Sequence, residues 1–248
     1  MWSGGLAAAP HTTPLRAVPL IFSYSKSGLR LGKDKPHMNQ PIRLDNLVDA
    51  MIFAAHKHQG QIRKDQQGSS YITHPVAVAQ SVLEIGRVGD RNVLLAALLH
   101  DTIEDTPTTP DEIRDQFGQD VLSIVLELTD DKSLPKDQRK QLQILHASSL
   151  SHAAKIIKLA DKLVNCQDIL HSPPKDWSLE RRRDYIQWAA DVVAQIRGTN
   201  LPLESAFDTM LAEAETELSF QLEPFETVSN RPWGPGRPKW NQAQHQDC

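Results

Sequence analysis

The chain has 248 residues, of which 40% are hydrophobic and 23% are charged, a mixture typical of a globular protein with one domain or two small ones. The net charge of −4 excludes a bulk basic surface, and no apolar run reaches the roughly 18 residues of a membrane span, so we expect neither a nucleic-acid nor a membrane partner. The two cysteines, Cys166 and Cys248, imply no disulfide framework and favour a reducing compartment such as the cytoplasm.

The first 33 residues differ in composition from the rest of the chain. They contain arginines, lysines and serines, and the first acidic residue is Asp34. A basic, acid-poor segment is typical of a mitochondrial transit peptide, but Pro10, Pro14 and Pro19 argue against a regular helix there. Residues 1–40 are therefore predicted to be either a disordered or a targeting extension.

The folded part is expected to span residues 41–219. Apolar residues at helical spacing predict a first helix over residues 41–58. Residues 62–64 and 70–72 flank a polar turn that contains Gly68, which predicts a short β-hairpin leaning on helices. A helix that starts at Pro75 should run to Gly86.

The remaining segments also have helical patterns. Asp90 is a candidate cap of the next helix, and Thr109 with Glu112 forms the pattern of a capping box for a helix to Phe117. Further helices are predicted over residues 120–128, 136–148, 153–170, 179–197 and 200–219. No strands alternate with these helices, so the fold class is all-α. The proline-containing residues 220–248 have little aliphatic content and are predicted to be a disordered tail.

The sequence HDTIED, residues 100–105, concentrates ligand-type and acidic side chains at the end of an apolar run. On a continuous helix, Glu104 would lie over His100 and Asp105 over Asp101. Pro107 disfavours helix just before it, so these groups should lie in a last turn, at a mouth. A polar cap on a buried helix would have the same composition.

Two other positions carry candidate metal ligands. His74 immediately precedes Pro75, and Asp161 interrupts the apolar helix IIKLADKLV. A carboxylate is rarely buried unless it is paired or binds a metal, so an ion pair with Lys158 or Lys162 is the competing interpretation. Asn165 and Asp168 share the helix face of Asp161, which favours a functional site.

Two imidazoles and two carboxylates form a mixed nitrogen and oxygen ligand set. Such a set suits Mn, Fe, Zn or Co, and it does not select among them. Glu104 and Asp105 would then be placed to orient or deprotonate a water molecule activated by the metal. Arg63 and Lys64 lie close to His74 in sequence and could hold a phosphate, although a solvated basic turn would look the same.

Four blocks in this order resemble the hydrolase domain of the RelA/SpoT alarmone enzymes, which belong to the HD-domain superfamily. They are RKDQQGSSYITHP, LLAALLHDTIEDT, LTDDKSLPKDQRK and AAKIIKLADKLVN. The chain is most similar to the small stand-alone alarmone hydrolases, the metazoan SpoT homologues. The resemblance covers residues 41–219 and implies an HD-domain helical bundle that removes the 3′-pyrophosphate of ppGpp, giving GDP and pyrophosphate.

The resemblance also implies roles for individual residues. Mn²⁺, with Zn²⁺ or Fe²⁺ as alternatives, would be held by His74, His100, Asp101 and Asp161. Glu104 and Asp105 would be the catalytic pair. Substrate contacts would come from the remaining matching positions, which are Arg63, Lys64, Asn165, Arg181, Tyr185, Trp177 and Lys136.

The chain departs from the family pattern at Ser70, Val164, Cys166 and Gln167. We expect these four positions to adjoin the nucleoside pocket, where they would affect base preference rather than metal chemistry. Because few residues follow Ser219, we expect a hydrolase without a synthetase domain.

Two other functions remain open at the level of sequence. Relatives are also credited with removing the 2′-phosphate of NADPH, and the same site would serve that or another nucleotide phosphatase reaction. A non-catalytic alarmone sensor would not need both the ligand set and the acid pair. A small-molecule nucleotide is thus the expected partner, and a homo-oligomer is a further expectation.

Overall fold

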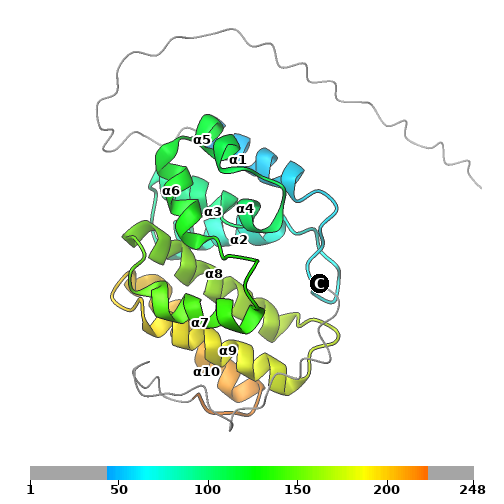
Figure 1. Cartoon of the computed structure of the whole chain (residues 1–248). Coiled ribbons are helices and arrows are strands. Elements are labelled where there is room, and N and C mark those ends of the chain that lie inside the picture. The colour runs from blue at the N-terminus through cyan, green and yellow to red at the C-terminus, as the bar shows by residue number, and fades with distance from the viewer. Residues whose placement is uncertain (1–43, 223–248) are drawn as a thin grey trace, which may run out of the picture. The chain divides into compact units, whose positions relative to one another are not determined.

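The computed structural model describes residues 44–222, all of which belong to the second of two units, residues 39–248. This part is helical, which confirms the all-α prediction (Figure 1). The helices are α1 (Leu44–Lys57), α2 (Thr73–Gln80), the π-helical turn η1 (Ser81–Ile85), α3 (Arg91–Leu99), α4 (Thr102–Asp105), α5 (Pro110–Phe117), α6 (Gln119–Leu128), α7 (Lys136–Ala147), α8 (His152–His171), α9 (Leu179–Ala194) and α10 (Leu201–Glu217). The predicted N-terminal extension and residues 223–248 of the predicted tail lie outside the described residues.

Helix α8 is the central element of this unit. In Figure 1 it crosses between a group formed by α1 to α6 and a group formed by α7, α9 and α10. It packs directly against α2, α3, α6, α9 and α10. Most of its residues are buried, as are all residues from Val93 to Leu99 in α3. Helix α3, which directly precedes His100 and Asp101, and helix α8, which carries Asp161, therefore form part of the hydrophobic core.

Local signals in the sequence determine several helix ends. Asp90 accepts hydrogen bonds from the backbone N–H groups of Asn92 and Val93, as predicted for an N-cap. Thr109 and Glu112 form the predicted capping box of α5. Asn200 caps α10 by accepting from the Leu203 N–H group at 3.1 Å.

Three predicted elements differ in detail. The hairpin is reduced to one antiparallel bridge between Ile62 and Ser70, with Gly68 at φ +66° in its turn. The helix predicted to run from Pro75 to Gly86 changes at Ser81 into a π-helical turn. The helix predicted over residues 179–197 ends as an α-helix at Ala194, and Gly198 follows with φ +82°.

The largest difference is a break between α3 and α4, so the condition of a continuous helix through residues 100–105 is not met. Helix α3 ends at Leu99, and Asp101 adopts φ −95° and ψ −5°. The Thr102 hydroxyl donates to the Leu99 carbonyl at 2.6 Å and thus replaces a backbone donor at the break. The two residues before Thr102, His100 and Asp101, consequently lie at a bend.

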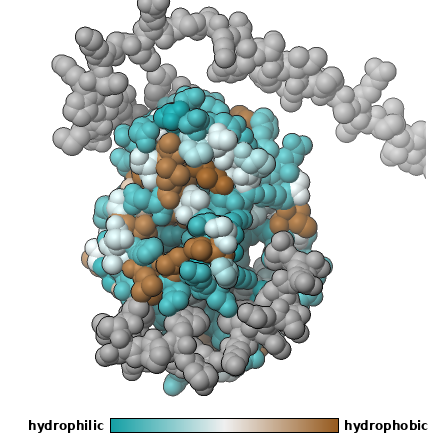
Figure 2. All heavy atoms as spheres, in the orientation of Figure 1, coloured by the Kyte–Doolittle hydropathy of each residue, from teal (hydrophilic) through white to brown (hydrophobic). Residues whose placement is uncertain are grey.

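The described surface does not present one large apolar face in the view of Figure 2, where apolar residues form separate patches among hydrophilic ones. Among residues 44–222, no helix combines the length and the apolar character that crossing a bilayer requires. Cys166 is a buried free thiol. The cytoplasmic and mitochondrial predictions both remain predictions, since the latter rests on residues 1–33.

Candidate metal centre and active site

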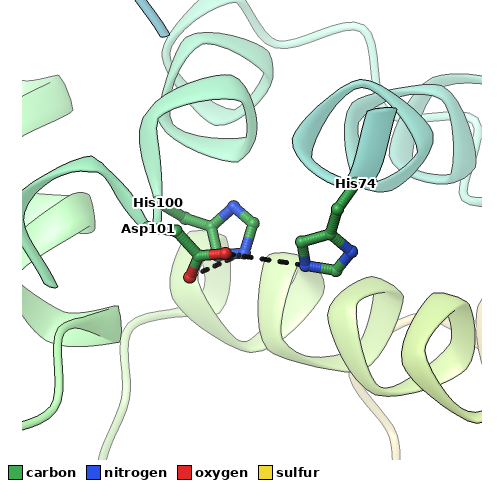
Figure 3. Close-up of side chains that lie close together, drawn as sticks. All are labelled: His74, His100 and Asp101. Atoms are coloured by element: carbon green, nitrogen blue, oxygen red, sulfur yellow. Dashed lines mark ion pairs between the residues drawn. The ribbon is translucent and has the colours of Figure 1, made fainter. Parts of the chain in front are cut away.

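His74 and the pair His100–Asp101 come together from two helices (Figure 3). His74 lies in the first turn of α2 and is 3% exposed, and its Nε2 atom is 3.6 Å from Asp101 Oδ2. His100 Nε2 is 3.2 Å from Asp101 Oδ1. Potential ligand atoms of the three residues lie within 4.8 Å of one another, which is a spacing that allows one metal ion to bind all three.

Asp161 approaches the same point from α8. Its Oδ1 atom is 3.2 Å from His74 Nε2 and 3.8 Å from His100 Nε2. Lys162 pairs with the other oxygen, Oδ2, at 3.1 Å, so the ion pair considered as the competing interpretation exists alongside the imidazole contacts. Asn165, one turn further along α8, donates its Nδ2 to Asp161 Oδ1 at 2.6 Å and orients the carboxylate.

The hydrogen bonds of His100 suit a metal ligand. Its Nδ1 donates to the Ala97 carbonyl at 2.9 Å, so that in the neutral imidazole, the form that binds a metal, the lone pair is on Nε2. That Nε2 is buried and has no hydrogen-bond partner within the described structure. Burial alone would lower the pKa of His100, but Asp101 and Asp161 raise this pKa to about 9. The nitrogen thus faces a strongly negative site, and the donor set fits a divalent cation.

Glu104 and Asp105 flank this cluster and are held by different partners. Glu104 accepts from the Asp130 N–H group at 2.9 Å and lies 3.6 Å from an Arg139 nitrogen. Burial raises the pKa of Glu104 to about 7. Asp105 forms an ion pair with Lys132. The connection between α6 and α7, which carries residues 130 and 132, therefore contacts both members of the predicted acid pair.

Tyr71 is a site residue that sequence reasoning missed. Its hydroxyl lies 2.6 Å from Asp101 Oδ2 and 3.1 Å from Asp105 Oδ2, as a donor shared between them. Burial, together with these carboxylates, raises the pKa of Tyr71 far above its usual value, so the hydroxyl remains protonated. The sequence feature that could have identified Tyr71 as a site residue was its position three residues before His74.

His58 supports Tyr71 from α1's C-terminal end. The two rings stack with centroids 4.7 Å apart and an interplanar angle of 30°. His58 Nδ1 donates to Gln61 Oε1 at 2.8 Å, and Gln61 Nε2 donates to the Asp105 carbonyl at 2.8 Å. Sequence reasoning did not indicate this contact of His58 with the site.

Arg63 borders a second, more apolar pocket of about 230 Å³ next to the metal centre. Its guanidinium donates to Asp168 at 2.5 Å and to Asn165 Oδ1 at 3.3 Å. Among the lining residues, Lys64, Trp177 and Tyr185 were predicted to contact substrate. An aromatic wall beside a guanidinium can hold a flat, anionic ligand such as a nucleotide.

The other predicted substrate residues are arranged around these pockets. Arg181 lies over the Trp177 ring, 4.3 Å from its centroid, and Trp177 in turn packs against Tyr185 at 5.7 Å. Lys136 lines the metal-centre pocket, as do four cationic residues that were not predicted to contact substrate, namely Arg139, Lys140, Lys158 and Lys162.

The positions that depart from the family pattern do not line the second pocket, the one that Arg63 borders. Val164 and Cys166 are buried in the hydrophobic core, and Ser70 lies in the β-bridge. Gln167 is half-buried and is absent from the lining of both pockets. The expectation that these four residues affect base preference stays a prediction. On α8, Asn165 and Asp168 line the pocket, whereas Val164, Cys166 and Gln167 do not.

Comparisons with known proteins agree with this arrangement. Residues 50–198 match the HD domain family. The chain is 50% identical over 167 residues to a protein of Xenopus tropicalis named guanosine-3′,5′-bis(diphosphate) 3′-pyrophosphohydrolase MESH1, covering 67% of this chain and 93% of the relative. The Homo sapiens protein of the same name is 49% identical over 160 residues, covering 64% and 89%.

A solved structure is similar as well. It is described as a metazoan ortholog of SpoT that hydrolyses ppGpp and plays a role in starvation responses. The match has a TM-score of 0.66 and 43% sequence identity, and it covers 68% of this chain and 94% of that one.

Proposed function

We propose a function from the premise that this chain belongs to the HD domain family. The chain is a hydrolase that removes the 3′-pyrophosphate of ppGpp and releases GDP and pyrophosphate, the activity in the names of relatives that it matches along about nine-tenths of their length. The observation that best supports this function is the convergence of His74, His100–Asp101 and Asp161 beside Glu104 and Asp105.

The HD domain implies a divalent metal, and we propose Mn²⁺ held by His74, His100, Asp101 and Asp161. Such a cation would polarise a phosphoryl oxygen and make a nearby water more acidic. The shared Tyr71 hydroxyl would fix the orientation of Asp101, and Asn165 would fix that of Asp161. These contacts keep the carboxylate oxygens directed towards the two imidazoles.

Glu104 is our candidate general base. Its pKa of about 7 allows the carboxylate to accept a proton from the attacking water near neutral pH. The water oxygen forms a bond to the phosphorus next to the ribose 3′-oxygen, and the bond between that phosphorus and the 3′-oxygen breaks. The 3′-oxygen leaves with a proton as a hydroxyl group. Asp105, which contacts Tyr71 and Lys132, is placed to orient the water.

The second pocket would hold the nucleoside part of the substrate. Trp177 and Tyr185 offer ring faces to the base, and Asn165 offers an amide. Arg63 and Lys64 would neutralise phosphate charge at the edge of this pocket. In the described structure Arg63 is paired with Asp168, which holds the guanidinium at that edge before substrate binds.

Incubation of the purified protein with ppGpp, NADPH and 3′-phosphoadenosine nucleotides tests this function. We expect Mn²⁺-dependent release of GDP and pyrophosphate from ppGpp, followed by anion-exchange chromatography, and loss of this release with a chelator. Binding of ppGpp without hydrolysis of any substrate would support a sensor instead. Faster turnover of NADPH than of ppGpp would assign the 2′-phosphatase reaction to this site.

A further inference from the structure

Four lysines on α7 and α8 form two pairs that line one pocket, and we call them the lysine cluster. Lys136 and Lys140 are four residues apart on α7, and Lys158 and Lys162 are four residues apart on α8. Residues at this spacing share one helix face. All four line the same pocket as His74, His100, Asp101 and Asp161. The cluster thus forms a cationic wall of the metal-centre pocket.

Trp188 of α9 holds two members of the lysine cluster in place. The Nζ atoms of Lys140 and Lys162 lie 4.6 Å and 4.3 Å from the centroid of its ring. The Trp188 indole N–H donates to the Lys140 carbonyl at 3.0 Å, which fixes the ring against α7. Cation–π contacts of this kind keep both ammonium groups beside one aromatic face. Lys140 and Lys162 are therefore preorganised and Lys158 is buried, whereas Lys136 is exposed at the edge of the cluster.

Grouping these charges is costly for the protein alone. Lys158 and Lys162 are 8% and 3% exposed. Burial, with the charges of Lys136 and Lys162, lowers the pKa of Lys140 to about 7, and burial also lowers the pKa of Lys158. A buried group of like charges becomes favourable when an anion lies between its members. The structure thus offers a polyanion site within the active-site pocket.

The lysine cluster and the nucleoside pocket occupy different places relative to the metal centre. The nucleoside pocket shares Tyr71, Asn165 and Tyr185 with the metal-centre pocket, but none of the four lysines lines it. Lys158 instead also lines a third pocket, which shares no lining residue with the nucleoside pocket. The lysine cluster therefore lies outside the nucleoside pocket but within the metal-centre pocket.

On the basis of the proposed function, we propose that the lysine cluster binds the distal phosphate of the 3′-pyrophosphate group and selects it over a monophosphate. The distal phosphate takes no part in bond exchange, since water attacks the proximal phosphorus and the ribose oxygen leaves. Binding energy from such a remote group can be used at the reacting centre. A substrate with a single phosphate would have no distal phosphate for the cluster to bind.

The substitution Lys158→Met tests this proposal, with Lys155→Met on the same helix as the matched control, because Lys155 lines none of these pockets. A charged hydrogen bond contributes enough energy for about a tenfold or larger change. We expect kcat/KM for ppGpp to fall about tenfold or more in Lys158→Met, and kcat/KM for any release of the 2′-monophosphate of NADPH to change less than about threefold. The control should change neither value.

A binding measurement makes the test independent of turnover. In calorimetry with the Mn²⁺-loaded full chain, the ratio of pyrophosphate to phosphate affinity should fall about tenfold in Lys158→Met and stay constant in Lys155→Met. Equal losses for pyrophosphate and phosphate, or for ppGpp and NADPH, would overturn the proposal. Lys140→Gln serves as a second variant if Lys158→Met does not fold, as judged by circular dichroism.

Failure of the wild-type chain to hydrolyse ppGpp would instead contradict the proposed function. The pyrophosphate-to-phosphate affinity ratio would still test the lysine cluster in that case, so the two failures are distinguishable.

Discussion

The two walls of the metal-centre pocket differ in how they are built. One wall is acidic and imidazole-rich and comes from α2, α3 and α4, with HDTIED as one short stretch of sequence. The other is the lysine cluster, which is assembled from α7 and α8. Adjacent histidine and aspartate residues at the end of an apolar run are unusual, whereas lysines on helices are common. Rare residue patterns therefore reveal the chemistry, and only the fold reveals the groups that select the substrate.

The largest effect should come from the acidic wall. Glu104→Gln keeps the shape of the side chain but removes its ability to accept a proton. We expect kcat to fall about 100- to 10,000-fold, with metal content and ppGpp affinity unchanged. Elemental analysis and calorimetry would measure the latter two. A variant that retains turnover would show that Glu104 is not the base.

Asp161→Ala should affect the metal first and activity as a consequence. Asp161 lies on α8, the helix that also carries half of the lysine cluster. This variant therefore removes a group of the metal centre while leaving the two lysines of the same helix in place. We expect metal affinity to fall more than about 100-fold, beyond the effect of losing an outer partner of a ligand. Unchanged metal content after dialysis would contradict the ligand role, and Asp168→Ala provides a control on the same helix face.

Tyr71→Phe should have an intermediate effect, because Tyr71 acts through Asp101 and Asp105. Loss of the shared hydroxyl should weaken metal binding about tenfold and lower kcat, with little change in KM. Titration of Mn²⁺ into the metal-free variant would measure the first effect. A change confined to thermal stability would reduce Tyr71 to a structural role.

Asp168→Asn should have a smaller effect at the nucleoside pocket. The substitution weakens the ion pair that holds Arg63 at the pocket edge. We expect KM for ppGpp to rise about three- to tenfold while kcat changes little, since the proposed contact of Arg63 with substrate is away from the reacting phosphorus. Steady-state kinetics would separate the two constants. An equal fall in kcat would place Arg63 closer to the chemistry.

The smallest expected effect is a pH dependence of stability due to Glu104. Burial raises its pKa from 4.5 to about 7, so the folded state favours the protonated acid. The associated stability is present below about pH 4.5 and is lost as the pH rises through about 7. Thermal unfolding in chelator should show Glu104→Gln gaining stability relative to wild type at pH 8 but not at pH 5. A constant difference would contradict the pKa shift.

Much of the fold followed from local signals, and the errors arose where side chains compete with the backbone. Asp90, Thr109 with Glu112, and Asn200 cap helices at the positions that their sequence context indicates. The break before Thr102 could not be predicted, because a threonine within a helical pattern gives no sign that its hydroxyl will replace a backbone donor. The same break places His100 and Asp101 at a bend.

The candidate site was predictable where residue type alone carried information. His74, Asp101 and Asp161 are polar groups in apolar surroundings, and a buried carboxylate calls for a partner. Tyr71, Lys140 and Lys158 carry no such signal, since tyrosines and lysines have many structural uses. The contribution of these residues to the site depends on which helix face lines each pocket. For the lysines, the packing of α7, α8 and α9 determines this.

The regular spacing of functional groups along α8 has a consequence for substrate length. Lys158, Asp161, Asn165 and Asp168 follow one another at intervals of three or four residues along α8. Lys158 belongs to the lysine cluster, Asp161 lies at the metal centre, and Asn165 and Asp168 line the nucleoside pocket. Ten residues of α-helix rise about 15 Å. A single α-helix therefore fixes the distances between these groups. The side chains at either end of this segment can be exchanged without moving Asp161 between them.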